Sequence, residues 1–148
     1  MVVYRISNPI FAQLTASGHE ARWNFRESFV LYTSQNISLA CLENVVHRQE
    51  VSLRIPYKLM YIEIPDDLSI KIIDYQDFPN KLIDLENKSF CQNMGDDWYQ
   101  SKETCILRVP SIIIPQEFNY IINTKHPDFK QIKLINKEDF WFDRRIKQ

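Results

Sequence analysis

The pattern of hydrophobic and polar positions along the chain predicts a β-sheet with a few helices between its strands. Short runs of β-branched and aromatic residues bounded by turn-forming residues are typical of strands. In the first half of the chain, such runs predict strands over residues 2–6, 28–33, 58–65 and 69–74. In the second half, we expect strands over 104–111, over 112–123 with an interruption at Pro115, and around 139–143.

Helical segments are expected between these strands. Ser34 is a good N-cap residue, and the sequence after it predicts a helix over 36–48. On a helical wheel of about 100° per residue, the apolar side chains of this segment spread around most of the circumference, which predicts a largely buried helix. We also expect a helix or loop over 9–18 that ends at Gly18, irregular structure with short helices over 75–93, and a short helix over 94–101.

The order of these elements defines the expected fold class. Strands outnumber helices, and the helices are interspersed, which favours an α/β (mixed α+β) fold with a mixed β-sheet core. No repeat, low-complexity tract or linker rich in proline, serine and glycine divides the 148 residues. We therefore expect a single domain over residues 1–148.

Glu43 is the residue of the 36–48 helix that most needs an explanation. On the wheel it falls between Leu39 and Ala40, and a charged carboxylate in apolar surroundings is costly unless it is paired, hydrogen-bonded or facing a wet cleft. An ordinary structural role is one option: a nearby arginine or His47 at i+4 pairs with it, or the side chain reaches solvent over the helix end. The alternative is a carboxylate that takes part in chemistry.

Composition and charge exclude several classes of function. With only two glycines, Gly18 and Gly95, the chain cannot form a Rossmann or P-loop phosphate-binding motif. The formal net charge of −1 gives no bulk attraction to nucleic acid or to an anionic membrane, so we expect neither as a direct partner. A local basic patch requires convergence in the fold of Arg22, Arg26, Arg48, Arg54 and Arg108.

Cysteines and histidines give no sign of a metal site. The three cysteines have no CxxC spacing, and the three histidines are far apart with no HxxxH or HExxH spacing. We expect reduced thiols and no metal. The N-terminal segment lacks the basic start and long apolar core of a signal peptide, and no apolar run approaches the length of a membrane span. A cytoplasmic protein is expected.

Three further residues have both an ordinary and a functional interpretation. Arg22 is either a surface arginine stacked on Trp23 or a bidentate clamp on a pyrophosphate. Tyr32 is either a core tyrosine or a ring that stacks on a planar heterocycle. Ser111 either satisfies a turn or points its hydroxyl into a site at the end of a strand.

The order of several motifs along the chain resembles the RES domain, the toxin of a bacterial toxin–antitoxin family. These motifs are "VYRI", "ARWN", "VLYTSQNISLACLE", "YIEIPDDL", "GDDW", "LRVPSIIIP", "FNYIIN" and "HPDF". The family takes its name from a separated Arg, Glu and Ser, which match Arg22, Glu43 and Ser111. One difference is Ala21, which stands where family members usually carry glycine before the arginine; a backbone with positive φ there would need the loop to shift.

The resemblance implies a fold like that of ADP-ribosyltransferases and an activity on NAD⁺. Members are associated with NAD⁺ hydrolysis, with phosphorolysis and with ADP-ribosylation of a protein, and all three reactions begin by breaking the nicotinamide–ribose bond. NAD⁺ is then a substrate rather than a bound cofactor, with inorganic phosphate as an optional co-substrate. The residues cannot separate these reactions, which differ only in the acceptor of ADP-ribose.

The resemblance also implies a role for each matched residue. Glu43 would stabilise the developing positive charge on the ribose, and Arg22 would bind the pyrophosphate or neutralise a phosphate nucleophile. Tyr32 would stack on or position nicotinamide, and Ser111 would hydrogen-bond the nicotinamide-side ribose or the amide. The implied partner is an Xre-type helix-turn-helix antitoxin, with a toxin homodimer inside the complex as a further option. A non-enzymatic interaction module, in which Glu43 is only an ion-pair partner, is the remaining alternative.

Overall fold

The fold is a single mixed sheet with helices at its ends and on one face. A computed structural model describes residues 1–47 and 55–146 of the chain. Its strands are β1 (Val2–Ser7), β2 (Val30–Ser34), β3 (Tyr57–Glu63), β4 (Ile70–Ile72), β5 (Ile106–Pro110), β6 (Phe118–Asn123) and β7 (Lys133–Phe140). The α-helices are α1 (Ile37–His47), α2 (Leu82–Glu86) and α3 (Lys88–Ser101), and 3-10 turns occur at Pro9–Phe11, Tyr75–Asp77 and Pro127–Gln131.

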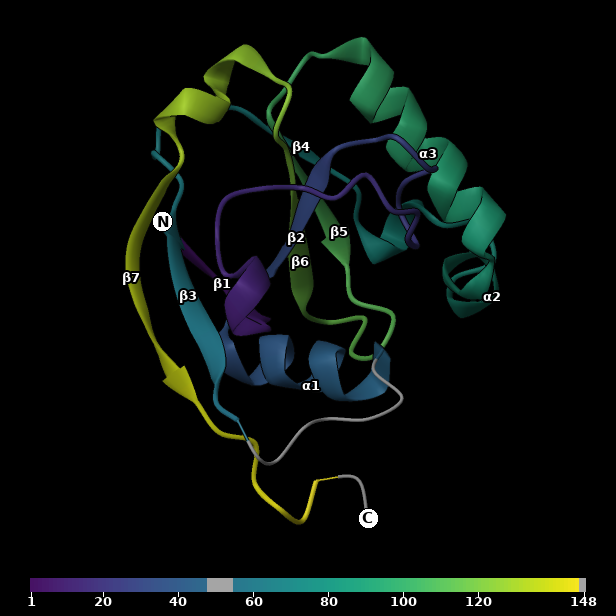
Figure 1. Ribbon diagram of the computed structural model, residues 1–148. Coiled ribbons are helices and arrows are strands. Elements are labelled where there is room, and N and C mark those ends of the chain that lie inside the picture. The colour runs from purple at the N-terminus through teal and green to yellow at the C-terminus, as the bar shows by residue number, and fades with distance from the viewer. Residues whose placement is uncertain (48–54, 147–148) are drawn as a thin grey trace.

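The seven strands lie in the order β4-β5-β6-β2-β1-β3-β7. Only the β4–β5 pair is parallel among the strand pairs of the described residues, so the sheet is mixed, as the sequence predicts. In Figure 1, α1 crosses one end of the sheet, whereas α2 and α3 lie together beside β5 and β7 forms the opposite edge. The expected mixed α/β fold is confirmed.

Most predicted strands are present, with shifts at their ends. The segment 112–117 is a loop rather than a strand, and the strand begins only at Phe118. Pro115 has no backbone N–H to give to a ladder, which fits a strand that starts beyond it. The last strand runs over Lys133–Phe140, earlier than the expected 139–143, and the expected short helix over 94–101 is the second half of α3.

The prediction that the 36–48 helix is largely buried is wrong. Only Leu39 and Ala40 are buried in α1, whereas Leu42 and Val46 are 38% and 57% exposed. The helix packs one side against the end of the sheet, where Ala40 joins a cluster with Ile6 of β1, and its other side faces solvent. Arg48, the last residue of the predicted helix, lies outside the described residues, as does Arg54.

The sheet is nearly divided between β1 and β2. β1 forms six residue pairs with β3, and β2 forms five with β6, but β1 and β2 share one pair, Tyr4 with Ser34, although both strands lie wholly within the described residues. Beyond that pair, the Arg5 guanidinium donates a hydrogen bond from Nη1 to the Tyr32 carbonyl oxygen at 3.1 Å. A side chain therefore joins the two half-sheets where the backbone ladder is missing.

Two larger hydrophobic clusters hold the half-sheets in shape. One contains Val3, Met60 and Ile106 and lies on one face; the other packs α2 and α3 against the opposite face through Leu85, Trp98 and other buried residues. In the part of the chain that the structure describes, no helix is long and apolar enough to cross a membrane.

Candidate active site

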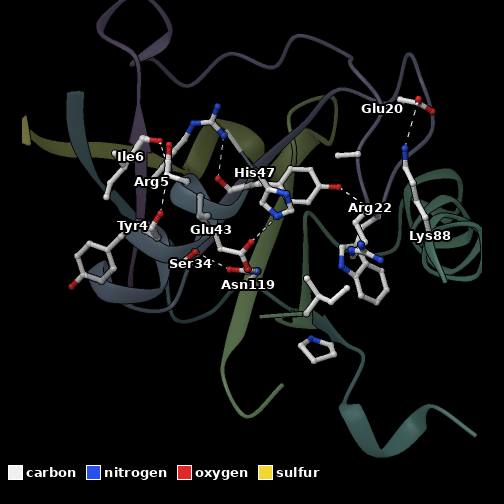
Figure 2. A pocket seen from close by; sticks show the side chains of 18 residues that line it. Tyr4, Arg5, Ile6, Glu20, Arg22, Ser34, Glu43, His47, Lys88 and Asn119 are labelled. Atoms are coloured by element: carbon white, nitrogen blue, oxygen red, sulfur yellow. Dashed lines mark hydrogen bonds and ion pairs between the residues drawn. The ribbon is translucent and has the colours of Figure 1, made fainter. Parts of the chain in front are cut away.

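A pocket of about 520 Å³ opens where β1 and β2 separate. This volume lies within the range of roughly 300–1,000 Å³ that is usual for small-molecule sites. Its walls come from β1, β2, α1 and the turn that carries Arg22, as Figure 2 shows. The lining residues are Tyr4, Arg5, Ile6, Glu20, Ala21, Arg22, Trp23, Tyr32, Thr33, Ser34, Ala40, Glu43, Asn44, His47, Lys88, Pro110, Ile112 and Asn119.

The Glu43 carboxylate is held by three side chains at one end of this pocket. Its Oε1 accepts hydrogen bonds from Ser111 Oγ at 2.9 Å and from Asn119 Nδ2 at 2.6 Å. Its Oε2 lies 2.9 Å from Nε2 of His47, one helical turn later on α1. The partners come from β6, from the residue after β5 and from α1 itself, so the tertiary fold fixes the orientation of the carboxylate.

These contacts set the protonation state of Glu43. Burial acts to raise the pKa of the carboxyl group, but the hydrogen bonds from His47, Asn119 and Ser111 together lower it below its ordinary value. Because its pKa is lowered, the group is ionised at neutral pH, and the 18% of its side chain that stays exposed makes it accessible from the pocket. The His47 partner that the sequence offers as an ordinary structural role for Glu43 is present, and a functional role for the carboxylate stays a prediction.

Ser111 lies behind Glu43 rather than on the pocket wall. The residue is fully buried, it does not line the pocket, and its Oγ also accepts hydrogen bonds from the backbone N–H groups of Ile113 and Ile114 at 3.1 and 3.2 Å. The direct contact with ribose or amide that the resemblance implies stays a prediction; in this structure the hydroxyl faces the carboxylate and the following turn. Its geometry suits a residue that orients Glu43.

Arg22 lies at the other end of the pocket. Its Nη1 donates hydrogen bonds to the backbone carbonyls of Leu85 and Glu86, at 3.0 and 3.2 Å, where α2 ends. Nearby, Lys88 at the start of α3 and Glu20 form an ion pair at 3.6 Å on the same side of the pocket (Figure 2). The contact with α2 fixes the guanidinium at the pocket wall, opposite Glu43.

The turn that carries Arg22 is clamped by α3. Gln92 is buried and donates from Nε2 to the carbonyl oxygens of Ala21 and Asn24, at 3.0 and 3.1 Å. Gly95, one helical turn later, lies so close to the turn that a Cβ atom there would be 1.8 Å from the Trp23 carbonyl oxygen. Glycine is required at this position by close backbone approach. Ala21 itself has no positive φ, so alanine fits the position without backbone strain.

Tyr32 joins the Arg22 turn to the pocket floor. Its hydroxyl donates to Asn24 Oδ1 at 2.8 Å and accepts from the backbone N–H of Trp23 at 3.0 Å. Burial raises the pKa of this phenol well above its ordinary value, so the hydroxyl stays neutral and can donate. The tyrosine is thus both a structural residue and part of the pocket wall.

The fold brings together candidate residues that lie up to 89 positions apart in the chain. It also adds pocket residues that the sequence does not predict. Arg22, Tyr32 and Glu43 line one pocket, and Ser111 supports it. Arg5 was missed as a pocket residue; the available signal was a charged residue inside the apolar run 2–6. Lys88 gave no signal, because it reaches the site only through the packing of α3 against the Arg22 turn.

Of the five arginines whose convergence would make a basic patch, Arg22 lines the pocket, Arg26 and Arg108 do not, and Arg48 and Arg54 lie outside the described residues. Arg108 pairs with Asp74 at 2.8 Å and stacks on Phe118 at 4.2 Å, away from the pocket lining. The cationic groups that line the pocket are Arg5, Arg22, Lys88 and, when protonated, His47. Over residues 1–47 and 55–146, no group of three or more His, Cys, Asp and Glu side chains is placed to hold a metal ion.

The arrangement can bind an elongated ligand with a negative and a positive centre. An ionised carboxylate at one end stabilises developing positive charge, and guanidinium groups bind phosphate oxygens in a bidentate manner. Tyr32 and Trp23 add aromatic side chains to the pocket lining. Among known families, the RES domain model matches residues 2–143 of the chain.

The chain belongs to the RES domain family. Curated relatives match most or nearly all of this chain. The protein named "Toxin Res" of Yersinia enterocolitica is 31% identical over 153 residues, which cover 99% of this chain and all of that protein. Another, "Prs ADP-ribosylating toxin" of Sphingobium sp. (strain YBL2), is 34% identical over 127 residues, which cover 84% of this chain and 79% of that protein. The resemblance to RES domain toxins is confirmed.

A solved structure supports the fold. The chain is similar to one in the crystal structure of the M. tuberculosis MbcT–MbcA toxin–antitoxin complex, with a TM-score of 0.75 and 17% sequence identity. The match covers 95% of this chain and 84% of that one. At this level of identity the likeness concerns the fold alone.

Proposed function

We propose that this RES domain toxin is an enzyme that breaks the bond between nicotinamide and ribose in NAD⁺. The observation that carries the proposal is the Glu43 carboxylate: it is ionised, held by three side chains and exposed to a pocket of the size of a small-molecule site. Nicotinamide leaves as a neutral molecule, and the ribose gains positive charge at its anomeric carbon. A fixed carboxylate stabilises this charge without reorganisation.

The remaining site residues have roles that follow from their positions. Arg22 binds the pyrophosphate at the opposite end of the pocket, or a phosphate nucleophile, because a guanidinium suits phosphate oxygens. The ring of Tyr32 positions nicotinamide against the wall between the two ends. Ser111 and Asn119 act through Glu43, because both donate to its Oε1.

The acceptor of ADP-ribose defines the reaction class. Hydrolysis or phosphorolysis would deplete NAD⁺ and arrest growth, and this is the leading proposal. Transfer to a cellular protein is the second candidate, favoured by the name of the ADP-ribosylating relative that is 34% identical. Both reactions begin with cleavage of the same bond in this pocket.

Product analysis tests the proposal. Purified protein is incubated with NAD⁺, with and without phosphate and with and without a cell extract, and the products are separated by chromatography. Free ADP-ribose indicates hydrolysis, a phosphorylated ADP-ribose indicates phosphorolysis, and label on protein indicates transfer. Failure to release nicotinamide under all of these conditions would contradict the proposal.

We also propose an antitoxin partner and a cytoplasmic place of action. The support is the structural neighbour, which belongs to a toxin–antitoxin complex, together with the toxin names of the relatives. The proposed partner is a helix-turn-helix protein of the Xre type encoded beside this chain. Gel filtration of the two proteins together, with light scattering, measures the stoichiometry and shows whether the toxin enters the complex as a dimer.

A further inference from the structure

His47 is placed to do more than hold Glu43. It lies in the last described turn of α1, lines the pocket, and keeps 56% of its side chain exposed while its Nε2 contacts the Glu43 carboxylate at 2.9 Å. Figure 2 shows the imidazole directly beside the carboxylate at the Glu43 end of the pocket. A histidine needed only to neutralise a buried carboxylate has no reason to remain open to the pocket.

The contact with Glu43 determines which ring nitrogen of a neutral His47 is basic. An ionised carboxylate accepts hydrogen bonds and cannot donate them, so Nε2 of the neutral ring carries the hydrogen in this contact. The lone pair is then on Nδ1. A carboxylate that orients a histidine in this way also stabilises the imidazolium that forms when Nδ1 takes a proton.

Glu43 retains capacity for the substrate while it holds His47. A carboxylate has about four lone-pair sites, and Ser111, Asn119 and His47 occupy three of them, which leaves one directed to a ribose hydroxyl or to the developing charge.

We propose that His47 is the general base that takes the proton of a neutral oxygen nucleophile, of which water is the simplest. The inference rests on the proposed cleavage of NAD⁺. The glycosidic C–N bond breaks with both electrons going to nicotinamide, the water oxygen bonds to the anomeric carbon, and the water proton moves to Nδ1 of His47 and then to solvent. A phosphate dianion already carries an ionised oxygen, so it needs no such base.

Two substitutions at His47 separate proton transfer from the simple support of Glu43. His47→Gln keeps an N–H donor for the carboxylate but has no basic nitrogen, and His47→Ala removes both. Positioned general bases contribute about 10²–10⁴-fold. We expect both variants to hydrolyse NAD⁺ slower by that factor, and imidazole added to the buffer to restore part of the His47→Ala rate. In phosphate, where the nucleophile is a dianion, the loss should be much smaller.

The matched control is His19→Gln, which changes an exposed histidine outside the pocket lining and should keep the parent rate. Thermal unfolding of every variant checks that the fold is retained. Full hydrolysis by His47→Gln, or a His47→Ala variant that imidazole fails to rescue, overturns the inference, and so does a parent protein that consumes NAD⁺ only when phosphate is present. A parent protein that releases no nicotinamide with any acceptor instead overturns the proposed function.

Discussion

The two ends of the pocket hold their charged groups in different ways. Glu43 is held by side chains, and its three partners come from three separate parts of the fold. Arg22 is held by backbone carbonyls, and its turn is clamped by α3. Substitutions near Glu43 are therefore expected to change its chemistry with little effect on shape, whereas substitutions near Arg22 change the shape of the pocket first.

The sharpest test of the Glu43 end is Glu43→Gln. Glutamine keeps the size of the side chain and removes the charge, and loss of one preorganised electrostatic contact typically costs about 10²–10³-fold in rate. We expect nicotinamide release to fall by at least this factor and toxicity in cells to disappear. A folded variant that is as toxic as the parent, and still neutralised by its partner, would instead support a non-enzymatic interaction module.

The corresponding test of the Arg22 end is Gly95→Ala. The added methyl group would lie 1.8 Å from the Trp23 carbonyl oxygen, so α3 or the Arg22 turn must move. Overpacking of this kind costs about 1–3 kcal/mol of unfolding free energy. We expect a lower midpoint in urea and a raised KM for NAD⁺. An unchanged KM in the destabilised variant would show that the position of Arg22 does not depend on this contact.

Ser111→Ala probes the support behind Glu43. It removes one of the three donors to the carboxylate and leaves the N–H groups of Ile113 and Ile114 without their acceptor. Leaving buried groups without a hydrogen-bond partner costs about 1–3 kcal/mol of unfolding free energy. Because Glu43 is also held less firmly, we expect kcat to fall about tenfold with KM unchanged. A large rise in KM would instead support the direct contact between Ser111 and the substrate that the resemblance implies. Steady-state kinetics with NAD⁺ distinguishes the two results.

The smallest expected effect is a pH dependence of stability that comes from Glu43. Its pKa is lowered in the folded protein, so ionisation favours folding. This contribution is fully present above the unfolded pKa of about 4.3 and is lost as the pH falls through the lower folded pKa. The change in unfolding free energy caused by Glu43→Gln should therefore become less destabilising on acidification. Urea unfolding of both proteins from neutral to acidic pH measures it, and a constant difference would contradict it.

The sequence predicts the elements of this fold better than their burial. The strands near residues 2, 30, 58 and 106 follow local composition, and each is found close to its expected place. The exposure of α1 is not predictable in this way, because apolar side chains on all sides of a helix do not tell which side the sheet covers. Val46, for example, is 57% exposed although its residue type favours burial.

Some residues of the site can be recognised from local sequence, and others depend on tertiary packing. The unusual position of Glu43 can be recognised from the helix alone, and His47 at i+4 is a geometric consequence of that helix. The approach of Ser111 and Asn119 to Oε1 depends on the order of strands in the sheet, which local patterns do not encode. The clamp by Gln92 depends on how α3 packs, and a buried glutamine in a helix gives no distinct signal in a single sequence.

The near-division of the sheet at β1 and β2 has a consequence for how such a pocket evolves. Strand edges that are not paired with each other present main-chain N–H and C=O groups toward the space between them, and every residue type except proline offers the same set. A ligand recognised partly by these groups tolerates extensive side-chain replacement. Replacing side chains on β1 or β2 would therefore leave these main-chain groups in place.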